Sequence, residues 1–307
     1  MRLLVLALAL LGGDPPDRGA RNRECGRCHA EIWREWSGSL HARALTERVF
    51  VDQWEGASKN EECVRCHAPA SVPATGMPEA RKDARDQGVD CLACHVDAEG
   101  RVRGTLGTAW HGARRKEDLA KPAACDPCHH EDRFPFFDQG TSFAKSPAAR
   151  EGKTCQSCHM PEVERRVANG KEGDALPPRR HRSHRLTSVT SAADLAAGYR
   201  LSLERVGGKL VARLESTAGH DVPGGAGRAL ILELAVLDAQ GKELRRQALT
   251  WAWRFNPLVA GKPAVRELAL PPGAAVARAR LVHYRVGGKG DGPENRTVVA
   301  ERELKLD

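Results

Sequence analysis

Five Cys-x-x-Cys-His motifs constrain this chain of 307 residues more than any other feature. In each motif, two thiols three positions apart can bond to the two vinyl groups of one porphyrin, and the histidine that follows can bind its iron. The motifs therefore predict five covalently bound haem c groups. The cysteines are Cys25, Cys28, Cys63, Cys66, Cys91, Cys94, Cys125, Cys128, Cys155 and Cys158, and no other cysteine occurs in the chain.

Other cysteine chemistries explain these motifs less well. Zinc knuckles use paired cysteines but do not require a histidine directly after each pair. A disulfide scaffold would leave five adjacent histidines unexplained, and a thioredoxin-like redox motif would occur once. We therefore expect the proximal iron ligands to be His29, His67, His95, His129 and His159.

The motif region has too little chain per motif for a core made of side chains. The motifs begin 38, 28, 34 and 30 residues apart, which leaves about 27 residues for each haem. Porphyrins are thus expected to fill the interior, and the region should not fold without them. We predict short helices joined by irregular segments, with the clearest helix after the first motif, where Ile32, Trp36 and Leu40 recur every four residues.

The sequence changes character after about residue 186, where cysteine no longer occurs. Apolar and polar residues then alternate in short runs, and glycine or proline marks several of the turns between them. The pattern predicts an all-β immunoglobulin-like sandwich at 188–307, with a small barrel as the alternative, after a pentahaem cytochrome c domain at 14–187. The runs are 199–206, 209–217, 228–238, 243–253, 265–270, 276–286 and 297–306.

Residues 1–13 have the pattern of a signal peptide. Arg2 precedes an apolar run from Leu3 to Leu11 that is too short to span a membrane, and small residues follow it. Haem c is attached outside the cytoplasm, which agrees with export. We expect a soluble protein in the periplasm or outside the cell.

The formal charge of +8 does not by itself indicate a nucleic-acid partner. Haem propionates and ferric iron centres would bring the net charge of the holoprotein to about +3. Arg179, Arg180, Arg182 and Arg185 are better explained as partners of propionates than as ligands of nucleic acid. The expected partners are redox proteins, and peripheral association with a membrane redox complex and oligomer formation stay open.

Seven histidines outside the motifs decide whether each iron has a second protein ligand. His41 lies twelve residues after His29, about 18 Å along a continuous helix, so it would serve a different haem. His130 directly follows His129 and would either bind an adjacent haem or lie on the surface. His111 lies in a flexible, glycine-containing loop that could bring it to its own or a neighbouring haem.

The other four histidines lie near or within the predicted strands. One of His181 and His184 is expected to bind iron, and we favour His184. His220 lies in a glycine-rich loop from which it could reach the haem domain, whereas His283 is expected to be a hydrogen-bonded histidine of the sixth strand. The predicted distal ligands are His41, His111, His130, His184 and His220.

The segment ECGRCHAEIWREWSGSLHARAL resembles the opening of the cytochrome c-554 family of multihaem cytochromes, in which CxxCH precedes a tryptophan, a serine and a histidine-alanine pair. The matching residues are Trp36, Ser39, His41 and Ala42. The resemblance covers roughly residues 22–185 and implies that His41 is a distal ligand of a later haem. The family's type member has four haems, whereas this chain has five motifs. The GHDVPGG segment is also similar to the GHxxPxG pattern of related multihaem proteins with a β-rich tail, which implies ligation by His220.

The resemblance implies electron transfer between a donor enzyme or quinol oxidase and a terminal acceptor. One alternative is a reductase or oxidase of a small nitrogen or sulfur species with one open haem site. However, the chain has no CxxCK motif, and its two tyrosines, Tyr199 and Tyr284, both lie in predicted strands. Another alternative is a subunit of an extracellular cytochrome filament. We expect an electron carrier rather than an enzyme, and assign no catalytic residue.

Overall fold

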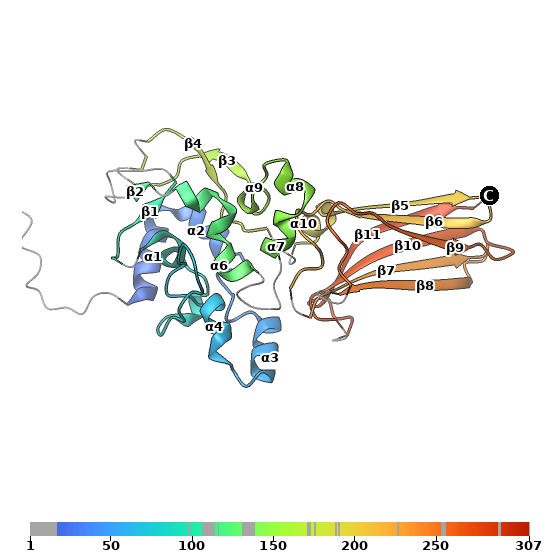
Figure 1. Ribbon diagram of the computed structural model, residues 1–307, viewed down its shortest axis with the longest axis horizontal. Helices are drawn as coiled ribbons and strands as arrows, with labels where there is room; N and C mark the ends of the chain where they lie inside the picture. The colour runs from blue at the N-terminus through green and yellow to red at the C-terminus, as the bar shows by residue number, and fades with distance from the viewer. Residues whose placement is uncertain are drawn as a thin grey trace, which may run out of the picture.

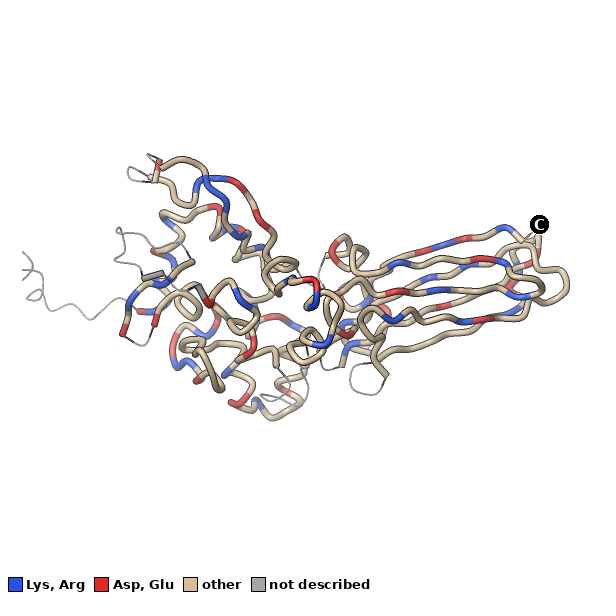
Figure 2. Tube along the Cα trace, turned by 45° about the horizontal axis from the view of Figure 1, so that its top comes forward, with Lys and Arg blue, Asp and Glu red and all other residues tan. Residues whose placement is uncertain are grey.

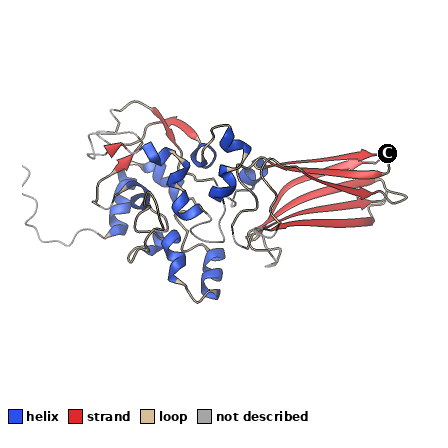
Figure 3. Cartoon of the chain, in the orientation of Figure 1, coloured by secondary structure: helices blue, strands red, loops and turns tan. Residues whose placement is uncertain are grey.

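In the computed structural model, a helical part and a strand-rich part lie end to end (Figures 1 and 3). The structure describes residues 17–97, 99–105, 114–115, 117–130, 139–170, 173–174, 176–187, 189, 191–225, 227–252, 256–287 and 290–306. The expected signal peptide at 1–13 and the predicted ligand His111 lie outside the described residues.

The helical part consists of short helices and two small strand pairs. β1 (Arg103–Gly104) and β2 (Arg114–Arg115) are parallel, whereas β3 (Glu162–Arg165) and β4 (Arg179–Arg182) are antiparallel. The helices are α1 Arg18–Cys28, α2 Ala30–Ser37, α3 Arg48–Gly56, α4 Glu61–His67, η1 Arg85–Gln87, α5 Cys91–His95, η2 Glu117–Ala120, η3 Pro122–Ala124, α6 Asp126–His129, α7 Gln139–Ala144, α8 Pro147–Arg150, α9 Cys155–His159 and α10 Ala192–Ala197.

Each motif forms a turn of helix, which explains its local geometry. The first cysteine and the histidine are four positions apart and so share one face of the turn. Side-chain caps begin four of the helices that carry motifs: Asp17 caps α1, Asn60 caps α4, Asp90 caps α5, and Thr154 forms a capping box with Ser157 at α9. These short helices are therefore specified locally by their caps.

The helix predicted after the first motif is shorter than the sequence suggested. α2 ends at Ser37, and the following segment to Thr46 consists of turns. The prediction of one continuous helix from His29 to His41 was wrong because serine and glycine at positions 37–39 favour a helix end. The 18 Å separation therefore does not apply.

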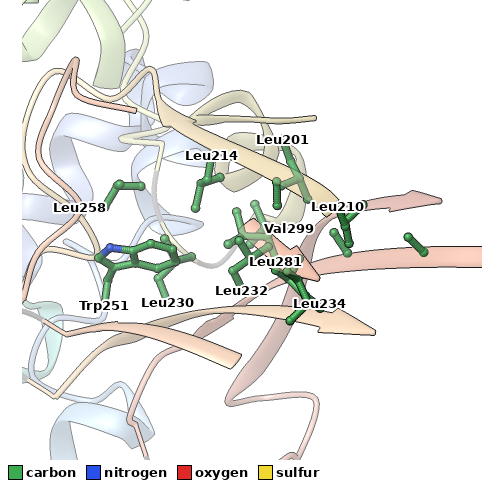
Figure 4. Packing of buried hydrophobic residues seen from close by; sticks show 14 of the residues in the cluster. Leu201, Leu210, Leu214, Leu230, Leu232, Leu234, Trp251, Leu258, Leu281 and Val299 are labelled. Atoms are coloured by element: carbon green, nitrogen blue, oxygen red, sulfur yellow. The ribbon is translucent and has the colours of Figure 1, made fainter. Parts of the chain in front are cut away.

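All seven runs predicted as strands form strands, and the β-rich C-terminal region is confirmed. They are β5 Tyr199–Val206, β6 Lys209–Ser216, β7 Ala229–Leu237, β8 Glu243–Ala252, β9 Ala264–Ala269, β10 Val276–Tyr284 and β11 Arg296–Lys305. One antiparallel sheet has the order β11-β10-β7-β8 and the other β5-β6-β9. Alternate residues point inward, and their leucines pack together with Trp251 and Val299 (Figure 4).

The two parts differ in the amount of side-chain core. The β part contains a cluster of 18 buried hydrophobic residues. Among the described residues of the helical part, the buried cluster consists of Leu45, Val64 and Ala68, with Phe50 and Trp54 packed against it. This difference agrees with an interior that side chains alone do not fill.

Charged residues of both signs alternate along the strands (Figure 2). On β10 and β11, Arg278 pairs with Glu303 and Arg280 with Glu301, each at 2.8 Å. Such exposed pairs contribute little stability but keep the outer face of the sheet polar. No helix in the described part of the chain is long and apolar enough to cross a membrane.

Candidate haem-binding site

Three pairs of histidine rings face each other at a spacing that suits one iron between them. The ring centres are 6.1 Å apart for His41 and His129, 6.0 Å for His95 and His184, and 6.3 Å for His159 and His220. A metal lies about 2.0–2.1 Å from an imidazole nitrogen, so imidazoles on opposite sides of one iron have centres about 6.2 Å apart. Each pair joins a proximal histidine of a motif to a histidine predicted as a distal ligand. The residues therefore fit haem iron.

Backbone carbonyls fix the tautomer of most of the proximal histidines and of two of the histidines that face them. A carbonyl only accepts, so the histidine Nδ1 that contacts it carries the proton and leaves Nε2 free to bind a metal. The contacts are His29 to Val167 (2.7 Å), His67 to Ala44 (2.6 Å), His95 to Arg103 (2.8 Å), His159 to Thr187 (2.8 Å), His184 to Arg182 (3.1 Å) and His220 to Asp221 (2.9 Å).

Burial also keeps the ring nitrogens unprotonated. Burial first, and then neighbouring imidazoles, lower the pKa of His41 and of His184 to about 4 and that of His129 to about 3. Burial likewise lowers the pKa of His95 and His220. Because a metal-binding imidazole must be neutral, these groups need not lose a proton at neutral pH to act as ligands.

The tryptophan–serine–histidine pattern after the first motif positions His41. The Trp36 indole donates to the Val89 carbonyl (2.8 Å), and the Val89 amide donates to the His41 carbonyl (2.8 Å). The Ser39 hydroxyl accepts from the Ala42 amide at 3.3 Å. Gly88 has a φ of 57°, and a Cβ there would clash with the His41 carbonyl oxygen. The pattern thus ties the His41 turn to residues 88–89.

An ion pair holds the segment that contains His184. Arg165 binds Glu35 on α2 with two hydrogen bonds of 2.9 and 2.7 Å, and Glu35 also accepts from the His184 amide at 2.8 Å. Burial opposes ionisation of Glu35, but bonds from Arg165, His184 and Ser183 hold its pKa below the ordinary value. Arg165 also lies 3.3 Å from Nε2 of His181. His184 therefore faces His95, whereas His181 contacts the arginine.

The loop that carries His220 is fastened to both parts of the molecule. The Asp221 amide donates to the Ser142 hydroxyl of α7 (3.2 Å), and the Asp221 carboxylate accepts from the Ala260 amide (2.9 Å). Val222 exchanges two backbone hydrogen bonds with Leu258, of 3.1 and 2.9 Å. This loop lies between β6 and β7, so the β part supplies one of the facing imidazoles.

The ring against His67 is not an imidazole. Phe50 of α3 stacks on His67 with ring centres 3.7 Å apart, and Trp54 stacks on Phe50 at 5.9 Å. Among the described residues, no histidine faces His67 at the spacing of the three pairs. The contact of Phe50 with His67 was not predictable from the sequence, because a lone aromatic residue on a short helix belongs to no motif.

Two other histidines differ from the ligand pairs. Nε2 of His130 lies 3.4 Å from the Thr141 hydroxyl, and distal ligation by His130 stays a prediction. His283 is 1% exposed, and neither ring nitrogen has a hydrogen-bond partner in the described structure. The expectation of a hydrogen-bonded strand histidine was therefore wrong, since His283 is buried on β10 near the charges of Arg228 and Arg285 without a hydrogen bond to either.

Cysteines of different motifs lie side by side. The Cys91 thiol, through a hydrogen bond, lowers the pKa of Cys25 to about 7, whereas the bond to Cys25 raises the pKa of Cys91. Thiol–thiol hydrogen bonds shift the pKa values of two further pairs in the same opposed manner. These pairs are Cys66 with Cys128 and Cys155 with Cys125. The Cys91 amide also donates to the Asn22 side chain of α1 at 3.1 Å, and the Gln156 side chain lies 3.9 Å from the Cys125 sulfur. The first motif thus adjoins the third and the fourth adjoins the fifth, and the shifts of Cys66 and Cys128 indicate that the second also lies near the fourth.

Comparisons with known proteins find a matching family model and a structural neighbour of similar fold. Residues 24–96, which contain the first three motifs, match the family model for cytochrome c554 and c-prime. The fold is similar to the crystal structure of a penta-heme cytochrome c552 from Thermochromatium tepidum, with a TM-score of 0.69 and 19% identity, over 92% of this chain and 98% of that one.

Other matches are weaker. The hypothetical protein PH1083 from Pyrococcus horikoshii matches 36% of this chain and 87% of its own with 13% identity, but its TM-score of 0.24 is too low to indicate a shared fold. No curated protein matches. The chain therefore resembles the cytochrome c554 family of multihaem cytochromes over residues 24–96, shares its fold with a penta-heme cytochrome, and has a β-rich C-terminal region.

Proposed function

We propose that the chain is an exported electron carrier with five haem c groups, most of them bound by two histidines. The observation that carries this proposal is the spacing of 6.0–6.3 Å in three facing imidazole pairs. Haem c, when bound, supplies a reversible one-electron couple. The ten cysteines would hold the five groups, and the matched penta-heme cytochrome supports that number.

The facing histidines favour electron transfer over chemistry at iron. Two imidazoles per iron leave no position for a substrate. In two of the three pairs, backbone bonds at Nδ1 hold both rings in place for both oxidation states. We assign His41 with His129, His184 with His95, and His220 with His159. His111 and His130 are the remaining candidates for the distal ligands of the irons that His29 and His67 would bind.

The adjacency of the motifs supports a branched route for electrons. The first motif adjoins the third, and the fourth adjoins the second and fifth through neighbouring cysteines. Hydrogen bonds to other cysteines and burial raise the pKa of Cys125 and Cys128 most, and the charge of Cys94 of the third motif adds to both shifts. The fourth motif would then connect three branches, with redox partner proteins at the ends.

A second candidate function rests on the surroundings of His67. Among the described residues, no histidine lies 6.0–6.3 Å from His67, the spacing of the three facing pairs, so this iron would keep an open position for a small nitrogen or sulfur species. His67 would remain the proximal ligand, its Nδ1 held by Ala44. The protein would then combine electron transfer with a reductase or oxidase site at the second motif.

Electron paramagnetic resonance of the oxidised holoprotein tests both candidates. The rings of His41 and His129 are nearly perpendicular (82°) and those of His159 and His220 nearly parallel (12°), so at least two distinct low-spin signals are expected. Entirely low-spin iron would exclude the open site. A high-spin signal from several irons would contradict the proposed electron carrier. A molecular mass that accounts for fewer than five haems per chain would contradict the proposed number of haems.

Replacing His184 and His181 separately tests the assignment of one ligand. His184→Ala is expected to convert one low-spin iron to high spin, because His184 faces His95. His181→Ala should leave the spin state unchanged, because its Nε2 contacts Arg165. Optical and resonance spectra of the two purified variants provide the measurement. The opposite result, a change only in His181→Ala, would exchange the two assignments.

We also infer that the β-rich region is an immunoglobulin-like sandwich. Numbered from β5, its first, second and fifth strands form one sheet, and its third, sixth and seventh strands form the other together with the fourth. A constant-type immunoglobulin domain has the same two groups but places its fourth strand beside the fifth. The signal-peptide pattern at 1–13 supports export to the periplasm or beyond the cell.

A further inference from the structure

Arg228 carries a partly buried guanidinium without a carboxylate partner among the described residues. It precedes β7, and its Nη1 donates to the Gly224 carbonyl at 2.9 Å. Glu47, the acidic group whose charge reaches Arg228, is bound by Arg285 at 2.8 Å. Removing a charged group from water costs free energy unless a counter-charge binds it, so we expect an anion to bind at this position.

The neighbours of Arg228 place it beside two ligand pairs. Through Gly224 it binds the loop that carries His220, and this loop contacts Ser142 of α7 through the Asp221 amide at 3.2 Å. After burial and neighbouring groups, the charge of Arg228 also lowers the pKa of His129 and His220, which pair with His41 and His159. The loop allows this approach because Gly225 has a φ of 85° and a Cβ there would lie 3.2 Å from Nη1 of Arg228. The guanidinium therefore lies at the junction between the sandwich and the fourth and fifth motifs.

None of the other groups that face Arg228 supplies negative charge. Burial, then Arg228 and Arg285, lower the pKa of His283 to about 3, so His283 stays neutral. Burial raises the pKa of Tyr199, which keeps the phenol protonated. Burial first and Arg285 second lower the pKa of Arg228 itself to about 10, which leaves it charged at neutral pH. The missing anion must come from outside the described side chains.

We propose that Arg228 binds an anionic carboxylate at this junction, namely a propionate of the haem held in the fourth or fifth motif. This inference rests on the proposed haem binding. A guanidinium matches a carboxylate with two parallel hydrogen bonds and stays charged when desolvated. Arg228 is then a positioning residue through which the sandwich orients the porphyrin and favours reduction of its iron. A small anion from solution has the same chemistry and is the other source.

Midpoint potentials of the full holoprotein, measured by spectroelectrochemistry, test the proposal. In Arg228→Met, the loss of positive charge should lower one haem potential by about 59 mV, a tenfold change in a one-electron equilibrium. Arg228→Lys should retain most of the wild-type value. Arg278→Met is the matched control, since Arg278 pairs with Glu303 on the outer face of the sheet. Unchanged potentials in Arg228→Met would overturn the proposal.

Two further readouts separate the possible causes. If a propionate is bound, titration of the wild type with acetate should leave its haem potentials unchanged. If acetate instead shifts a potential in the wild type but not in Arg228→Met, the site binds a small anion and the propionate assignment is overturned. Five haems with unchanged spin states in Arg228→Met would show that ligation is intact. A wild-type protein without those haems would instead contradict the proposed function.

Discussion

Replacing all ten cysteines with alanine is expected to leave the helical part unfolded while the β part folds. The reason is the clustering of buried apolar side chains: 18 residues form one cluster in the β part and α10, whereas the cluster of the described helical part contains three, Leu45, Val64 and Ala68. The other buried hydrophobic residues of the helical part, Trp36, Ala42, Leu92 and Ala93, lie outside that cluster. Burying one leucine contributes about 1.5–3 kcal/mol, so the larger cluster is sufficient for a small domain. The smaller one is not, once the entropy of ordering the chain is included.

The polar contacts of the helical part do not replace a core. Asp90 is buried, caps α5 and accepts from Arg18 at 2.7 Å and from Arg81 at 2.9 Å. Desolvation of such buried ions largely cancels their attraction, so the network stabilises a structure only where other groups already exclude water. Thioether-bound porphyrins are the groups expected to do so here, as in other small domains that fold around a metal.

Amide hydrogen exchange and circular dichroism provide the measurement. In the cysteine-free variant, protection should persist along β5–β11 and be lost along α1–α9, with a far-ultraviolet spectrum dominated by strand. The holoprotein is the control and should protect both parts. Protection of the α-helices at the level of the strands in the cysteine-free variant would contradict this expectation and would require a side-chain core that the described residues do not contain.

The strands and the motifs were predictable because their determinants are local. A two-residue alternation marks each strand, and CxxCH is contiguous. The end of α2 at Ser37 was missed because apolar spacing outweighed a local serine and glycine. The isolation of His283 was missed because burial on an inward face depends on the neighbouring strands rather than on its own sequence.

The partners of the proximal histidines were not predictable because each pair joins distant parts of the chain. The sequence suggested His41, His184 and His220 as ligands, but only the fold brings them opposite His129, His95 and His159. Glu35 and Arg165 lie far apart in sequence and together hold the His184 segment. Arg228 was predicted only as the first residue of the strand run 228–238, and its surroundings depend on the fold.

His220→Ala is expected to convert one low-spin iron to high spin and to free one coordination position. His220 faces His159 with nearly parallel rings, and its loop is held by bonds from Asp221 to Ser142 and Ala260. No second imidazole of the described residues lies opposite His159, so the loss cannot be compensated from there. Absorption and resonance spectra of the purified holoprotein would show the change, together with new binding of cyanide.

Added imidazole provides the control for His220→Ala. If the variant lacks only a ligand, free imidazole should restore the low-spin spectrum, because the loop and its anchoring bonds remain. Asp221→Ala keeps His220 but removes the hydrogen bond from the Ala260 amide to the Asp221 carboxylate. It should give a smaller high-spin fraction than His220→Ala. An unchanged spectrum in His220→Ala would contradict ligation and confine the β part to a structural role. The expected change would instead make the sandwich a contributor to the coordination of iron, so that unfolding the strands would also alter the redox centre.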